Sequence, residues 1–134
     1  MSAAEQIEIR RLASAALHEQ IDGLAAVLND CVAGGASVRY MAPFSHEQAR
    51  SAFEAVALEV EQGRRLLLAA FAGEELVGTV QVALAMPPNQ PHRAEIAKLL
   101  VRRSARRRGI AERLMAQAEL ERSEERRVGK ECRL

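Results

Sequence analysis

The spacing of apolar residues divides the first part of the chain into a strand and a helix. Residues 7–12 alternate between apolar and polar, with Ile7 and Ile9 on one side, which predicts a short, half-buried strand. From Leu17 onward, apolar residues recur at steps of three and four, which predicts an amphipathic helix that ends near Gly34. The residues on its predicted buried face are Leu17, Ile21, Leu24, Val27, Leu28 and Cys31.

A second helix is predicted by its start signal and its apolar face. Ser45 followed by Gln48 has the pattern of a capping box, in which each end of the motif satisfies a backbone amide of the other. The helix would stop at Gly63. Its predicted buried residues are Ala49, Phe53, Val56 and Val60.

The next segments predict three strands and a third helix. Residues 66–71 and 76–84 are apolar runs on either side of a Gly-Glu turn, which is typical of a β-hairpin. After the proline-rich residues 86–92, which must leave the sheet, residues 95–101 predict another strand. Residues 109–121 return to helical spacing. The predicted order is β-α-α-β-β-β-α, which places the chain in the α/β (α+β) class.

Beyond Arg122 the helical spacing stops. Residues 123–134 contain only two strongly apolar residues, Val128 and Leu134. A helix extension and a disordered tail are both compatible with this composition. With 134 residues in total, the chain has the length of one domain.

Composition excludes several classes of function. The net charge of +1 and an aromatic content of 3% argue against nucleic-acid binding, which needs a basic surface or stacking platforms. Cys31 and Cys132 lie too far apart for a disulfide framework or a metal knuckle, so we expect no metal site. No stretch reaches the roughly 18 apolar residues of a membrane span, and no leader pattern begins the chain. We therefore expect a cytoplasmic protein that contacts neither nucleic acid nor membrane.

The strongest candidate for chemistry is the turn between residues 101 and 109. It joins an apolar strand to a helix that begins at a glycine, and it carries Arg106, Arg107 and Arg108. Helix starts offer unpaired N–H groups and the positive end of the helix dipole, so this arrangement favours a phosphate or pyrophosphate. By itself, the arginine run is also compatible with a solvated charged turn.

The order of elements together with this turn resembles the GNAT superfamily of acetyl-CoA-dependent N-acetyltransferases. Its signature is Gln or Arg, two free positions, Gly, one free position, and Gly or Ala; here Arg106, Gly109 and Ala111 fill the defined positions. Residues 89–101 resemble, more narrowly, the branch related to tabtoxin-resistance acetyltransferases. The resemblance implies a mixed, mostly antiparallel sheet flanked by helices, with acetyl-CoA as cosubstrate and a small-molecule primary amine as acceptor.

The same resemblance assigns roles to particular residues. The pantetheine arm is expected beside the fourth strand and the diphosphate at the helix start. The implied cofactor-binding residues are Leu99, Leu100, Val101, Arg106, Arg107, Arg108, Gly109, Ile110 and Ala111. Glu95 is the candidate catalytic base, although a carboxylate paired with Arg93 or Lys98 is an alternative. His92 could contact substrate, or be an ordinary loop histidine.

The chain departs from the family pattern after the third helix, where family members continue with further strands and a helix that carries a tyrosine acid. We therefore expect residues 1–122 to form an incomplete acetyltransferase domain and residues 123–134 to be a tail outside the family pattern. The fourth strand would keep an exposed edge that invites pairing with another copy. Activity would then be weak, and the alternative function is a non-catalytic acyl-CoA-binding or protein-interaction fragment.

Overall fold

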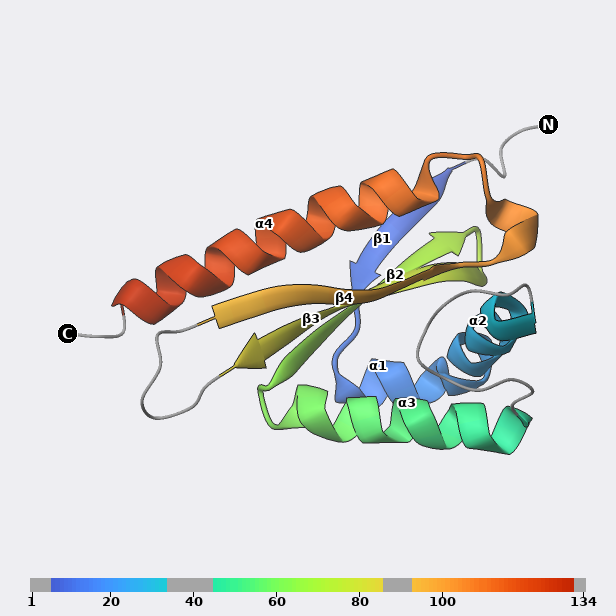
Figure 1. Ribbon diagram of the computed structural model, residues 1–134, viewed down its shortest axis with the longest axis horizontal. Helices are drawn as coiled ribbons and strands as arrows, with labels where there is room; N and C mark the ends of the chain where they lie inside the picture. The colour runs from blue at the N-terminus through green and yellow to red at the C-terminus, as the bar shows by residue number, and fades with distance from the viewer. Residues whose placement is uncertain (1–5, 34–44, 86–92, 132–134) are drawn as a thin grey trace.

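The computed structural model describes residues 6–33, 45–85 and 93–131. These residues form one antiparallel sheet of four strands in the order β1-β2-β3-β4, with α1, α2 and α3 on one face and α4 on the other (Figure 1). The elements are β1 Ile7–Arg11, α1 Ser14–Glu19, α2 Ile21–Ala33, α3 His46–Glu61, β2 Arg65–Ala72, β3 Glu75–Ala85, β4 Arg93–Val101, the 3-10 turn η2 Arg103–Ala105 and α4 Ile110–Glu131. The predicted fold class and order of elements are confirmed, with the first predicted helix divided in two.

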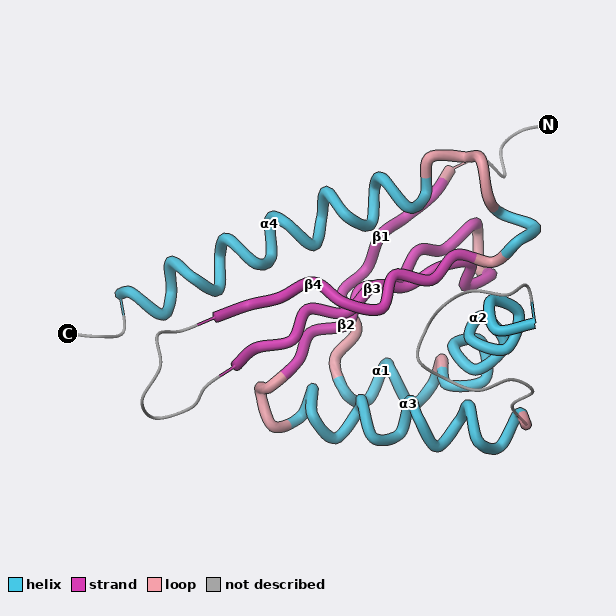
Figure 2. The backbone as a smooth tube through the Cα atoms, in the orientation of Figure 1, coloured by secondary structure: helices cyan, strands magenta, loops and turns pink. Residues whose placement is uncertain are grey.

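Both faces of the sheet are buried, which explains the unbroken apolar run in β2. Its residues alternate between two cores. Leu67, Ala69 and Phe71 pack toward α1, α2 and α3. Leu66, Leu68 and Ala70 pack toward α4. A strand covered on both faces has no reason to alternate with polar residues, so the apolar run predicts a central strand. Figure 2 shows the resulting layers of helix, sheet and helix.

The helix predicted from Leu17 onward is interrupted at Gln20. There the backbone N–H of Gln20 donates to the carbonyls of Ala16 and Leu17, which closes α1, and α2 begins at Ile21. The predicted apolar residues are nonetheless all buried, from Leu17 to Cys31. The spacing predicted the buried face correctly and missed the break, because both helices pack the same stripe of residues against the sheet.

Two local signals in the sequence are confirmed at atomic detail. The Ser45 side chain accepts from the Gln48 backbone, and the Gln48 side chain accepts from the Ser45 backbone, so α3 begins with a complete capping box. The strands β2 and β3 form the predicted antiparallel hairpin around Gly73, whose φ is +65°. Positive φ at this position is readily adopted by glycine.

The last helix extends further than its apolar spacing predicts. α4 runs from Ile110 to Glu131, so it crosses residue 122 without interruption, and a helix extension rather than a disordered tail is what the structure contains up to Glu131. Ile110, Leu114 and Ala118 lie against the sheet, which fixes the first half of the helix. None of the described helices is long and apolar enough to cross a membrane.

Candidate active site

The end of β4 and the start of α4 are joined by a tight turn with an unusual backbone. After η2, both Arg107 (φ +68°) and Gly109 (φ +74°) adopt the left-handed conformation. This conformation costs an L-residue such as Arg107 about 1–2 kcal/mol, whereas Gly109 adopts it without a steric penalty. The turn therefore stores backbone strain at Arg107, and strain of this kind is common at ligand sites.

A surface hollow of about 370 Å³ lies at this turn. Its lining residues are Leu99, Val101, Ala105, Arg106, Arg107, Gly109, Ile110, Ala111 and Glu112. The structure thus brings together the residues predicted to bind the cofactor, except Leu100 and Arg108. Leu100 faces the opposite side of the sheet, where it lines a small, mostly apolar cavity with Phe53 and Leu28.

Backbone amides at the start of α4 are available to a ligand in this hollow. The first amide of the helix to reach a carbonyl is that of Arg113, which donates to the Gly109 carbonyl at 3.1 Å. The amides of Ile110, Ala111 and Glu112 precede it and have no helical carbonyl behind them. They are the donors that an anion would use. The Glu112 side chain also lines the hollow and would have to turn away from an incoming phosphate.

Gly109 leaves the space in front of these amides open. A Cβ built at this position would meet only the Glu112 Oε1 within 4 Å, at 3.7 Å. No neighbouring group of the described chain therefore requires a glycine by crowding; the positive φ does, and the missing side chain keeps the hollow accessible. The residues present fit a diphosphate placed against the first turn of α4.

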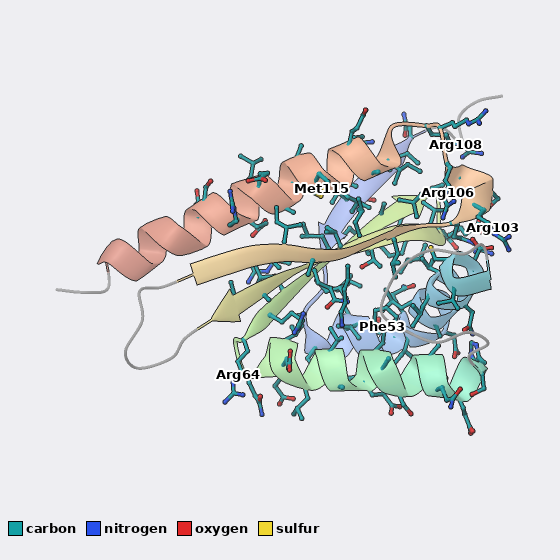
Figure 3. The ribbon with its side chains drawn as sticks, viewed as in Figure 1. Phe53, Arg64, Arg103, Arg106, Arg108 and Met115 are labelled. Atoms are coloured by element: carbon teal, nitrogen blue, oxygen red, sulfur yellow. The ribbon has the colours of Figure 1, made fainter. Side chains whose placement is uncertain are left out.

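The three arginines of the turn have different surroundings. The Arg106 Nε donates to the Val101 carbonyl at 3.2 Å and its Nη2 lies 3.9 Å from the Cys31 Sγ, so this side chain folds back onto the end of β4 (Figure 3). Arg107 and Arg108 are exposed, and neither forms an ion pair within the described residues. Arg107 and Arg108 are accordingly the arginines with guanidinium groups available to an anion.

A β-bulge that the apolar spacing did not predict interrupts β4 next to the hollow. Thr79 pairs with Leu100 and Gln81 with Ala97, so Lys98 and Leu99 together lie opposite Val80. Lys98 has a φ of +56°. A bulge disrupts the ladder locally and leaves backbone groups of the strand unpaired by their neighbour.

The bulge has a signal in the sequence that could have revealed it. Ile96 and Val101 both pack toward α4, although they are five positions apart. In a regular strand only residues an even number of positions apart share a face, so one extra residue must lie between them. The alternating pattern does end at Lys98 and gives way to three apolar residues, which marks the place.

Glu95 lies in β4, on the N-terminal side of the bulge, and its backbone is paired opposite Ala83. His92 lies outside the described residues. No group of three or more His, Cys, Asp or Glu side chains is arranged to hold a metal ion in the described ranges. The features that the structure brings together at this end of β4 are therefore the hollow and the bulge.

Comparisons with known proteins place this arrangement in a family. The model of the acetyltransferase (GNAT) family matches residues 36–134. The PaiA N-acetyltransferase of Thermoplasma acidophilum, crystallised with coenzyme A, has 22% identity and a TM-score of 0.60 over 89% of this chain and 73% of its own. An aminoglycoside acetyltransferase from an uncultured soil metagenomic sample has 19% identity and a TM-score of 0.61, over 88% and 70%. A GNAT acetyltransferase of Staphylococcus aureus has 15% identity and a TM-score of 0.65, over 88% and 78%. The chain belongs to the GNAT family of acetyltransferases.

Proposed function

We propose that this chain transfers the acetyl group of acetyl-CoA to a primary amine of a small molecule. GNAT acetyltransferases use acetyl-CoA, and the observation that carries the assignment to these residues is the hollow at the start of α4. There, the amides at the start of α4, Gly109 and the exposed Arg107 surround the space that a diphosphate would occupy. A neighbour described as an aminoglycoside acetyltransferase supports a small amine as acceptor, as does the similarity of residues 89–101 to the tabtoxin-resistance branch.

The cofactor would lie along two features of the site. Its diphosphate would contact the amides of Ile110 and Ala111, with Arg107, which lines the hollow, supplying positive charge. Its pantetheine arm resembles a peptide and would run beside residues 99–101, where β4 has a strand neighbour on one side only within the described residues. Acetyl-CoA supplies the acetyl group as a thioester. The buried free thiol of Cys31 is compatible with a cytoplasmic location, because that compartment keeps thiols reduced.

The residues of the chain supply two further requirements of acetyl transfer. An ammonium acceptor must lose a proton before its nitrogen attacks the carbonyl carbon, and we assign the proton to Glu95, directly or through a water molecule. The carbonyl oxygen gains negative charge as the C–N bond forms, and a backbone N–H at the bulge, from Leu99 or Leu100, would donate to it. The C–S bond then breaks, and the released thiolate takes up a proton.

Glu95→Gln is expected to lower kcat by about 100-fold or more, because the amide cannot accept the proton and general-base catalysis contributes ~10²–10⁴-fold. The Michaelis constant for acetyl-CoA should change little, since the proposed cofactor contacts lie elsewhere. Steady-state release of coenzyme A with a panel of small amines measures both quantities. Glu74→Gln, at the exposed turn between β2 and β3, is the matched control. An unchanged kcat in Glu95→Gln would remove Glu95 from the mechanism.

A binding measurement beside the turnover assay separates catalysis from binding alone. Calorimetric titration with acetyl-CoA tests the cofactor site, and turnover tests the complete function. Binding without turnover by any amine would favour a non-catalytic acyl-CoA-binding protein. Absence of binding would reject the proposed site.

The free edge of β4 carries a separate expectation. Within the described residues β4 pairs only with β3, and Leu99 on this strand is 37% exposed. We expect this polypeptide to self-associate through that edge and to turn over slowly, since the edge borders the hollow. In sedimentation velocity, Leu99→Lys should shift the protein to monomer, because a charged side chain disfavours edge pairing. Leu58→Lys, at a 55% exposed leucine of α3, should leave the oligomers intact. A monomeric wild type would contradict this expectation.

A further inference from the structure

The last turn of α2 contacts the turn that carries the proposed cofactor site. The Asp30 carboxylate accepts a hydrogen bond from the backbone N–H of Arg103 at 2.7 Å and another from its Nε at 3.3 Å. The Nη2 of the same guanidinium lies 3.3 Å from Asp30 Oδ1. One carboxylate of α2 therefore holds both the backbone and the side chain of a single residue of the turn.

The neighbouring residue of α2 holds the other side of this junction. The Cys31 thiol donates to the carbonyl of Val101, the last residue of β4, at 3.4 Å. Burial raises the pKa of this thiol, so it stays protonated and keeps its donor. The same carbonyl accepts the Arg106 Nε. Both ends of the segment between β4 and the strained Arg107 are thus tied to α2 or to β4.

The segment between β4 and α4 depends on such contacts for its shape. η2 is only three residues long, and Arg107 adopts a conformation that an L-residue disfavours. A backbone of this kind persists where surrounding structure holds it in place. Asp30 is ionised at neutral pH, because the hydrogen bond from the Arg103 backbone and the nearby guanidinium groups lower the pKa of its carboxyl. Its side chain is 23% exposed, so water screens the contact only in part.

We propose that Asp30 is a positioning residue for acetyl-CoA: it holds the turn of residues 102–109 so that the amides of α4 face the hollow. The role rests on the proposed function, because it assumes that the cofactor binds there. Asp30 itself does not line the hollow. Asp30 acts through Arg103 on the part of the turn whose residues line the hollow.

Asp30→Ala is expected to weaken acetyl-CoA binding about tenfold, or about 1.4 kcal/mol, in calorimetric titration. It should also speed amide hydrogen exchange in residues 102–109 while leaving the exchange of β2 unchanged, since loss of the contact loosens the turn and not the core. Asp30→Asn keeps an oxygen that can accept from the Arg103 N–H, so it should recover part of both losses. Asp22→Ala is the matched control, because this carboxylate of α2 contacts His46 and Arg50 of α3 instead.

The two readouts distinguish failure of this inference from failure of the proposed function. If the wild type does not bind acetyl-CoA, the proposed function is wrong, and the role of Asp30 in binding is lost with it. If the wild type binds, equal affinity in wild type and Asp30→Ala overturns the positioning role. Weaker binding together with faster exchange throughout β2 also overturns it, since the effect would then be global. If Asp30→Ala does not fold, the affinity and exchange of Asp30→Asn relative to Asp22→Asn decide the question.

Discussion

Replacing Arg107 and Gly109 together by glutamate is expected to weaken acetyl-CoA binding by at least about 100-fold, or about 2.7 kcal/mol. Arg107→Glu exchanges an exposed cation of the hollow for an anion. Gly109→Glu adds a second carboxylate and a Cβ where the diphosphate would approach the amides of α4. Isothermal titration calorimetry of the folded double variant with acetyl-CoA measures the loss.

The chain offers a closely matched control for this pair of substitutions. Gly63 has a φ of +76°, nearly that of Gly109, and is followed by the exposed Arg64. Figure 3 shows Arg64 at the opposite end of the molecule from Arg106 and Arg108. Gly63→Glu with Arg64→Glu makes the same change in net charge and imposes the same backbone strain, so it should leave the affinity within about threefold of wild type, or about 0.7 kcal/mol. Equal affinities in both double variants would show that the hollow is not the cofactor site.

Gly78→Val is expected to destabilise the fold by separating α4 from the sheet. A Cβ at Gly78 would lie 3.1 Å from the Leu100 carbonyl oxygen, 3.2 Å from Leu114 Cδ1 and 3.4 Å from Ile110 Cγ2. Adding side-chain volume to a packed core costs typically about 1–3 kcal/mol, and the backbone oxygen in this contact cannot move aside like the end of a side chain. Urea denaturation followed by circular dichroism measures the loss, which should also reduce acetyl-CoA affinity because Ile110 begins the helix that lines the hollow.

A double-mutant cycle tests whether the contact between the new side chain and Leu114 causes the destabilisation. Leu114 is fully buried, so Leu114→Ala should cost about 2–5 kcal/mol on its own. It also removes the Cδ1 that the new side chain would meet. The loss of stability in the double variant should therefore be smaller than the sum of the two single losses by about 1 kcal/mol. Additive losses would contradict the contact. As a control, Leu28→Ala, in the core on the opposite face, should combine additively with Gly78→Val.

Much of the fold can be predicted from the sequence because its signals are local. The capping box of Ser45 and Gln48 acts within one helical turn, and the spacing from Leu17 to Cys31 reports a buried face directly. The break at Gln20 escaped prediction, since two helices that bury one continuous stripe have the same apolar spacing as one. The sequence left the end of α4 open between a helix extension and a disordered tail, because its last residues are polar and lack the stripe that marks a packed helix.

The candidate site also has some features that the sequence predicts and others that it does not. The sequence predicts the order of strand, basic turn and glycine at Gly109, and in the structure most of the predicted residues line one hollow. The sequence does not predict the surroundings of the three arginines. They depend on the contacts of Arg106 with the Val101 carbonyl and with Cys31, which lies on a different element. The direction of the Leu100 side chain was not predicted either: the bulge at Lys98 places it in the core opposite to α4, while the proposed contact of this residue with the cofactor is through its backbone.

The sequence by itself determined the order of the elements, the buried faces of the helices, the β2–β3 hairpin and the position of the helix start at Gly109. Each of these follows from period or from residues within one turn of each other. Only the tertiary structure decided which arginines of the turn remain available, and that Asp30 holds Arg103, its partner 73 positions away. Such contacts are set by how packed elements meet in space, and residues so distant in the chain leave no periodic trace of their pairing.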